Sequence, residues 1–219
     1  MHEARCSRQQ NAEKLICRSE HIASKGKVFL TLAQNIIMSR KYKFGDKTGA
    51  YFISFATVYW IDVFTRDEYF QNIVESLDYC RKNKGMEIYG YCIMPSHIHL
   101  IFRSDNGDPS GIIRDFKGFT SRKMLKTIEE NQQESRKEWM LWMFERAGKK
   151  NSNVKNRQFW QQNNKPIEIW SLKVFEQKLN YIHNNPLETG FVSNPVDWKY
   201  SSATNYGDND QTVLEIDIN

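Results

Sequence analysis

Residues 94–102, MPSHIHLIF, place two histidines on alternate positions at the start of an apolar run. Side chains two residues apart on a strand point to the same face of a sheet. His97 and His99 therefore share one face, while Ile98 and Leu100 share the other, which is suited to packing on helices. Two neutral imidazoles supply two ligands of a metal site and need a third from elsewhere. For such a pair taken alone, hydrogen bonds to backbone on an exposed sheet face are the alternative.

The apolar periodicity around this strand predicts an α+β fold. A ferredoxin-like sandwich, with helices on one face of an antiparallel sheet and an added C-terminal helix, has the expected order strand–helix–strand–strand–helix–strand–helix. The predicted strands are residues 51–60, 87–93, 97–103 and 165–170, and the predicted helices are 66–82, 109–130 and 172–184.

Local signals place the ends of these helices. Thr65 followed by Glu68 predicts a capping box, and Gly85 a helix end. Ser171 is placed to cap the last helix and Pro186 to stop it. The apolar face of the helix over 109–130 is expected to hold Ile112, Ile113, Phe116, Phe119 and Leu125.

We expect one folded domain over residues 38–206, with an extension at 1–37 outside it and a flexible tail at 207–219. A composition of 40% hydrophobic and 13% aromatic residues supports a sizeable core. Within the domain, 131–165 is polar and basic and is expected to be partly irregular. The apolar stretch 28–38 is too short to span a bilayer. We therefore expect a cytoplasmic protein without a membrane partner.

A second motif, LNYIHNNP over residues 179–186, adds a phenol and an amide. Tyr181 and Asn185 stand one helical turn apart and face the same side, and Pro186 is expected to push Asn185 out of helical conformation. A phenol is a poor nucleophile until a base or a metal assists it. A His-bound divalent metal that polarises a phosphate oxygen would allow Tyr181 to attack phosphorus.

Together these motifs resemble a known family. MPSHIHLIF is similar to the His–hydrophobic–His motif of the HUH single-strand endonucleases. YIHNNPLETGFV followed by DWKYSSATNY resembles the C-terminal signature of the REP-associated tyrosine transposases, relatives of the single-tyrosine insertion-sequence transposases. The basic start SRKYKF and the strand YFISFATVYW also fit, so the resemblance covers residues 38–206.

The resemblance implies a role for each motif residue. His97 and His99 become metal ligands, Tyr181 the nucleophile and Asn185 the third ligand, where the insertion-sequence branch tends to have Gln. The implied enzyme is a transposase and endonuclease that cleaves and rejoins single-stranded DNA at hairpins through a 5′-phosphotyrosine intermediate. Its implied cofactor is Mg²⁺ or Mn²⁺. Its partner is single-stranded or hairpin DNA of a bacterial nucleoid, and it acts as a monomer or homodimer.

Basic residues cluster where such DNA would need phosphate contacts. Residues 136–165 hold eight basic and two acidic residues, a net charge of +6 within a chain of net charge +5. Trp139, Trp142, Phe144, Phe159 and Trp160 lie among them, either stacking on bases or packing in the core. The candidate DNA contacts are Arg40, Lys41, Lys43, Arg114, Lys117, Arg122, Lys123, Lys149, Lys150, Lys155 and Arg157.

Two other functions stay open at this point. A ferredoxin-like sheet also binds single-stranded nucleic acid without chemistry, although binding alone needs neither the His pair nor Tyr181. A metal-dependent hydrolase that uses water as its nucleophile is the second. A protein–DNA adduct on a denaturing gel separates both from the tyrosine route.

Overall fold

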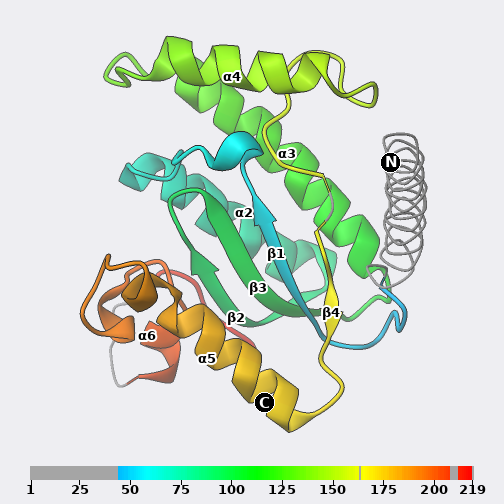
Figure 1. The fold of residues 1–219 in the computed structure, drawn as a ribbon. Helices are drawn as coiled ribbons and strands as arrows, with labels where there is room; N and C mark the ends of the chain where they lie inside the picture. The colour runs from blue at the N-terminus through cyan, green and yellow to red at the C-terminus, as the bar shows by residue number, and fades with distance from the viewer. Residues whose placement is uncertain (1–43, 163, 208–211, 219) are drawn as a thin grey trace, which may run out of the picture. The chain divides into compact units, whose positions relative to one another are not determined.

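A four-stranded antiparallel sheet lies at the centre of the described chain (Figure 1), and the computed structural model describes residues 44–162, 164–207 and 212–218. The elements are β1 (Tyr51–Ala56), η1 (Val58–Trp60), α2 (Asp67–Lys84), β2 (Met86–Ile93), β3 (His97–Ser104), α3 (Pro109–Glu130), α4 (Lys137–Lys149), β4 (Ile167–Glu168), α5 (Leu172–Glu188), η2 (Pro195–Asp197) and α6 (Ala203–Tyr206). The strand order β2-β3-β1-β4 is that of a ferredoxin-like sandwich, so the predicted fold class is confirmed. The predicted extension at 1–37 lies outside the described residues.

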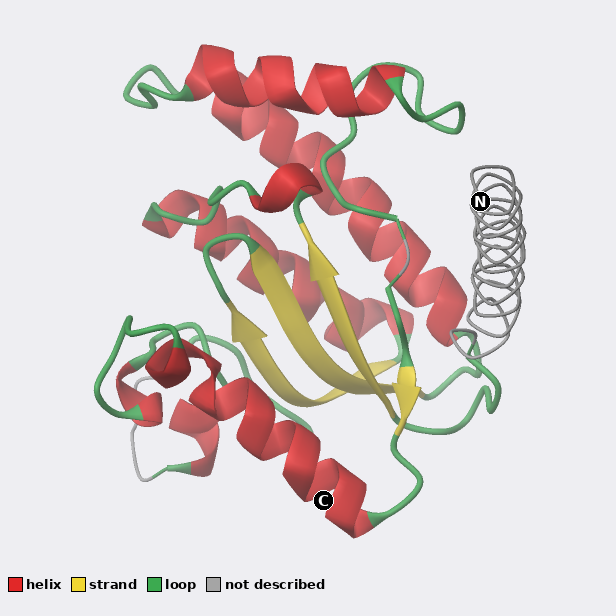
Figure 2. Cartoon of the chain, viewed as in Figure 1, coloured by secondary structure: helices red, strands yellow, loops and turns green. Residues whose placement is uncertain are grey.

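The two faces of β3 are used differently, as the alternation of its side chains predicts. Ile98, Leu100 and Phe102 belong to the main core, which also contains the apolar faces of α2 and α3. Ile101, on the opposite face, packs in a smaller cluster with Ile182 of α5. Figure 2 shows the sheet between these helical layers. The His pair therefore lies on the side that α5 covers.

The ends of α2 and β1 differ from the predictions. Gly85 does end α2, with a φ of 66° that suits glycine. The predicted capping box is wrong, because the N-cap is Arg66 and the Thr65 hydroxyl accepts a hydrogen bond from Arg136 at 2.9 Å. The first strand stops at Ala56, earlier than predicted, because the chain then turns into η1.

Residues 131–165 are more ordered than predicted, because they contain α4. Met140, Phe144 and Ala147 fall at helical spacing and are buried, a pattern obscured in the sequence by the basic residues around it. Phe159 and Trp160 are buried as well. The apolar face of α3 is also corrected, because Phe119 is 51% exposed and not part of the core.

The C-terminal part shows two further corrections. Pro186 does not stop α5, which runs on to Glu188. Proline near a helix end forgoes one backbone hydrogen bond without breaking the remaining turn. The tail is not free over residues 212–218, where Leu214 is buried and the backbone N–H of Asp217 donates to the Ile88 carbonyl at 2.7 Å. None of the helices in the described part of the chain has the length and apolar character that a bilayer span requires.

Glu134 joins three parts of the helical layer. Its side chain is 1% exposed and lies 3.2 Å from Nε of Arg66 and 3.0 Å from Nε of Arg136. The Tyr69 hydroxyl donates to it at 3.3 Å. Burial works to raise the pKa of Glu134, but hydrogen bonds from Arg136 and Arg66 outweigh it and hold the pKa at about 2. The turn before α4 is thus tied to the start of α2.

We predict that Glu134→Gln lowers the free energy of unfolding by ~3 kcal/mol at pH 7, because two guanidinium groups lose their buried, charged partner. A carboxylate with a lowered folded-state pKa stabilises the protein above its unfolded pKa of 4.5. That stability is lost as the pH falls from there towards about 2. Urea unfolding of both proteins at neutral and acid pH tests this.

The matched control is Glu138→Gln, on the exposed side of α4, which should leave the unfolding free energy nearly unchanged. A wild-type minus Glu134→Gln difference that stays constant from pH 7 to pH 3 would contradict the assignment.

Candidate active site

The two histidines stand at the start of β3, beside the end of β1. His97 is paired with Ala56 and His99 with Ser54. The imidazole centroids are 4.8 Å apart and their planes cross at 81°. His99 is buried, whereas His97 is partly exposed. The alternation of side chains along β3 brings both rings to the α5 side of the sheet, and the β1–β3 register places Ala56 and Ser54 beside them.

A serine hydroxyl lies beside Nδ1 of each ring. Ser54 Oγ is 2.7 Å from Nδ1 of His99, and Ser96 Oγ is 3.2 Å from Nδ1 of His97. This leaves Nε2 of both rings for another partner. Nε2 of His99 is buried and has no hydrogen-bond partner. Such orientation of a histidine through its other ring nitrogen is usual in metal sites.

Burial keeps both imidazoles neutral at neutral pH. Burial, with a smaller contribution from the neighbouring His97, lowers the pKa of His99 to about 3. Burial also lowers the pKa of His97, although the nearby Asn185 amide offsets part of that effect. Neutral rings keep a lone pair free, which is the form that binds a metal.

α5 is held close against the sheet by a small residue and a polar contact. A Cβ added to Gly90 of β2 would lie 2.8 Å from Cδ1 of Leu179 and 3.1 Å from Cδ1 of Ile182, so a larger residue there would force these side chains to shift. His183 Nε2 lies 2.8 Å from Ser202 Oγ, which also accepts from the Tyr91 N–H at 2.9 Å. The strand, the helix and the segment before α6 are thereby fixed together.

This docking carries Tyr181 and Asn185 to the His pair. The Tyr181 ring centroid lies 5.2 Å from that of His99 and 6.0 Å from that of Phe52. Tyr181 is 43% exposed. Asn185 is buried, and its Oδ1 has no hydrogen-bond partner. Asn185 lies within the helix, so the prediction that Pro186 pushes it out of helical conformation is wrong.

These donors fit a divalent cation. Two neutral imidazoles and an amide oxygen gather at one spot, and two of their acceptor atoms are buried without partners. Buried polar atoms of this kind need a partner, and a metal ion supplies one. Within the described residues, no group of three or more His, Cys, Asp or Glu side chains has metal-binding geometry. His97, His99 and Asn185 are the candidate ligand set.

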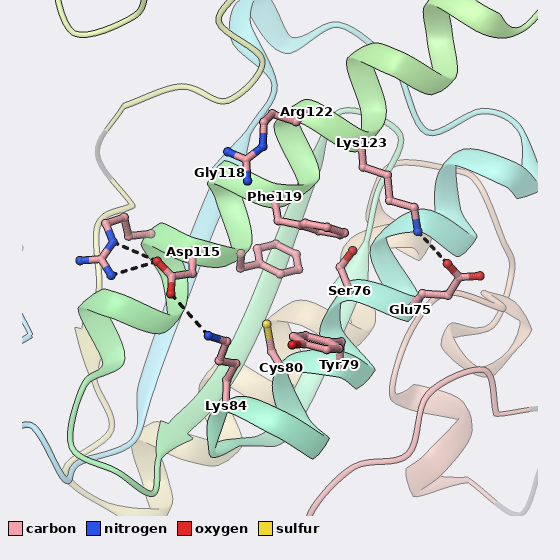
Figure 3. Close-up of a pocket in the computed structure, with 12 residues that line it drawn as sticks. Glu75, Ser76, Tyr79, Cys80, Lys84, Asp115, Gly118, Phe119, Arg122 and Lys123 are labelled. Carbon is pink, nitrogen blue, oxygen red and sulfur yellow. Dashed lines mark hydrogen bonds and ion pairs between the residues drawn. The ribbon is translucent and has the colours of Figure 1, made fainter.

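The candidate DNA contacts on α3 lie on the other helical layer. Arg122 and Lys123 line a groove between α2 and α3 (Figure 3), and Lys123 pairs with Glu75 at 2.7 Å. Arg114, on the same groove, pairs with Asp115 at 2.9 Å. This layer covers the sheet face opposite the His pair.

Lys117 of α3 is committed to contacts within the protein. Its Nζ donates to the Gln161 carbonyl at 2.8 Å and to Asn164 Oδ1 at 2.6 Å. Burial lowers the pKa of Lys117 to about 8. The residue joins α3 to the segment that leads into β4.

Four further candidate DNA contacts lie at the end of α4 or in the segment after it. Lys149 pairs with Glu145 at 2.6 Å and Arg157 with Glu129 at 3.4 Å, whereas Lys150 and Lys155 are exposed. Trp139 and Trp142 are exposed on α4, unlike the buried aromatic residues Phe144, Phe159 and Trp160. Arg40, Lys41 and Lys43 lie outside the described residues.

Several neighbours of the site were not singled out from the sequence. Ser54 reaches His99 only through the β1–β3 register, which no local pattern reveals. Trp60 lies 5.2 Å from the His97 ring by centroids. Lys178 places Nζ 5.1 Å from the Phe52 ring and precedes Tyr181 by three residues, a spacing that helical periodicity makes visible.

Comparison with known proteins first matches part of this chain to a transposase family. The family model described as "Transposase IS200 like" matches residues 48–144, which include His97 and His99 but end before Tyr181. The resemblance seen in the sequence motifs is confirmed.

Individual proteins also match this chain. A REP-associated tyrosine transposase of Haemophilus influenzae is 31% identical over 116 residues. These are 53% of this chain and 58% of that protein, so the match spans under two thirds of the relative. A solved structure of a REP-associated tyrosine transposase bound to a REP hairpin has a TM-score of 0.52 and 18% identity. It covers 73% of this chain and 79% of that chain, a likeness of fold.

We predict that Asn185→Ala weakens Mn²⁺ binding by at least about tenfold, because the cation loses one of three protein ligands. His99→Ala should weaken it further. Electron paramagnetic resonance of free Mn²⁺ during a titration measures the affinity without any substrate.

Asn184→Ala is the matched control, because the Asn184 side-chain amide donates to the Asn180 carbonyl and Asn184 is not a candidate ligand. Equal Mn²⁺ affinities for the Asn184 and Asn185 variants would exclude Asn185 as a ligand.

Proposed function

We propose that this protein is a transposase and endonuclease that cleaves and rejoins single-stranded DNA with Tyr181 as its nucleophile. The observation that carries the proposal is the 5.2 Å separation of the Tyr181 and His99 ring centroids on one face of the sheet. A binding module would need neither the unpartnered imidazole nitrogen nor the phenol beside it. The partial family match, the REP-associated relative and the likeness in fold to a transposase solved with a REP hairpin support the same function.

The proposed step is a transesterification. Tyr181 Oη forms a bond to the scissile phosphorus, the bond from phosphorus to the 3′ oxygen breaks, and the phenolic proton ends on the new 3′-OH. The products are a 5′-phosphotyrosine and a free 3′ end. Reversal with another 3′-OH rejoins DNA without an external energy source. A Mg²⁺ or Mn²⁺ ion held by His97, His99 and Asn185 would polarise the phosphate.

The surroundings of Tyr181 suit a nucleophile that must meet a bulky substrate. Its side chain is 43% exposed, so a DNA strand has access to the hydroxyl. The two histidines behind it are neutral and held by serines, which leaves them ready to bind the cation. Because one chain supplies the phenol, the imidazoles and the amide, we propose that a monomer suffices for cleavage.

Phosphate contacts are proposed for the basic residues after α4. The segment that follows them is bound to the active-site end of β1, because Val58 N–H donates to the Phe159 carbonyl at 2.8 Å and Gln161 N–H to the Ala56 carbonyl at 2.8 Å. Lys150 and Lys155 are exposed. DNA that reaches the His pair can therefore contact these two lysines more easily than Arg122, which lies on the opposite helical layer. A hairpin stem is the proposed occupant.

We predict that Tyr181→Phe abolishes the covalent protein–DNA adduct, a loss of at least about 10³-fold, because the ester is proposed to form on the Tyr181 hydroxyl, which phenylalanine lacks. The assay uses hairpin DNA with single-stranded flanks, Mn²⁺ and a denaturing gel. Tyr79→Phe, an exposed tyrosine on α2, should form the adduct like wild type. Cleavage by wild type without any adduct would favour the hydrolase that uses water.

We also predict that Lys150→Gln combined with Lys155→Gln reduces the salt dependence of hairpin binding. Each lost phosphate contact lowers the slope of log K against log salt by about 0.9 for duplex DNA, so two contacts lower it by roughly 1.8. Fluorescence anisotropy at several salt concentrations measures the slope. Arg122→Gln is the control and should keep the wild-type slope. The reverse pattern would move the DNA path to the groove between α2 and α3.

A further inference from the structure

The turn after β1 holds two consecutive residues in a backbone conformation that suits glycine. Tyr59 has a φ of 57° and Trp60 a φ of 55°. Aromatic residues adopt this left-handed region only at a cost in free energy, and such strain collects at functional sites. The turn is η1, just beyond the β1 residue that pairs with His97.

Hydrogen bonds on both sides keep the turn in place. Thr57 N–H donates to the Ser96 carbonyl at 2.9 Å, and Thr57 Oγ1 donates to the Ile61 carbonyl at 2.8 Å. Val58 N–H donates to the Phe159 carbonyl at 2.8 Å. Ser96 immediately precedes His97, so the turn is tied to the strand that carries the candidate metal ligands.

The turn presents two aromatic side chains to solvent. Tyr59 is 44% exposed and Trp60 is 58% exposed, whereas the flanking Val58 and Ile61 are both only 5% exposed. The Trp60 ring centroid lies 5.2 Å from that of His97, with the planes at 68°. A large, rigid and accessible aromatic side chain thus borders the place where the scissile phosphate is proposed to bind.

This arrangement matches what a nucleobase needs. Bases of single-stranded DNA stack on exposed aromatic side chains, and every base has a face for this. If the scissile phosphate binds at the His pair, the base on the adjoining sugar must lie no further from the His pair than the length of one nucleotide. Trp60 is fixed at that range by the hydrogen bonds of the turn.

We infer that Trp60 is a stacking platform for the unpaired base next to the scissile phosphate. The inference rests on the proposed function for its location, and it adds a base-binding subsite to it. Stacking there holds the phosphodiester against Tyr181 and keeps the strand unpaired at that nucleotide. Trp60 is a positioning residue, since it contacts the base and not the reacting atoms.

The test measures binding without chemistry. Fluorescence anisotropy in EDTA, with Tyr181→Phe protein, follows a labelled DNA hairpin that carries a single-stranded thymidine flank. Trp60→Ala should weaken binding about tenfold, while Trp60→Phe keeps most of the affinity. Tyr79→Ala, an exposed aromatic residue on α2, is the control and should bind like the parent protein.

A scan of single abasic positions along the flank supplies the decisive comparison. At one position, removing the base should weaken binding of the parent protein about tenfold. Removing the same base should not weaken binding of the Trp60→Ala protein, because the base has lost the ring on which it stacks. The inference would be overturned if, at every position, the fold-loss in affinity from the missing base were the same in the parent and the Trp60→Ala proteins. Trp60→Ala binding as tightly as Tyr79→Ala would do the same.

Two further measurements distinguish base stacking from support of His97 and from failure of the proposed function. Mn²⁺ affinity of Trp60→Ala should equal that of wild type, and a tenfold loss would mean that Trp60 only supports His97 and would overturn the platform. Failure of the proposed function appears separately, as wild-type protein that forms no covalent adduct. The abasic scan needs neither metal nor adduct, so the two results are independent.

Discussion

The arrangement of the candidate active site depends on the close docking of α5 on the sheet. Gly90 leaves room for Leu179 and Ile182, and the contact between His183 and Ser202 adds a polar anchor. A larger residue at position 90 would force the Leu179 and Ile182 side chains to shift. Both contacts join α5, which carries Tyr181, to the sheet that carries the His pair.

Burial on this face accounts for the two histidines in one strand. A solvated pair would titrate in the physiological range, but desolvation lowers the pKa of both rings and keeps them neutral. Ser54 and Ser96 occupy the Nδ1 sides, so the remaining nitrogens are free to bind. Burial also raises the free-energy cost of leaving such atoms unpartnered. The same environment that makes the site ready for a cation makes it costly for the protein without one.

The number of basic residues in the sequence overstates how many basic side chains are available to DNA. Lys117 is turned inward, and Arg66 and Arg136 enclose Glu134. Other basic residues hold neighbouring acidic groups, such as Lys123 with Glu75. A cluster counted along the sequence therefore divides in space into structural cations, paired cations and a smaller exposed set after α4. Within the described part of that cluster, the exposed set after α4 is the one that we propose as a path for DNA.

The sequence by itself determined the fold class and the residues of the candidate site. Period-two alternation separated the His face of β3 from its core face, and helical spacing paired Tyr181 with Asn185, because both signals are local in the chain. It did not reveal α4, the passage of α5 through Pro186, or the partner of each histidine. Only the tertiary structure decided those, because they depend on packing and on strand register between distant segments. The strained turn at Trp60 belongs with them, since hydrogen bonds to Ser96 and Phe159 hold it in place.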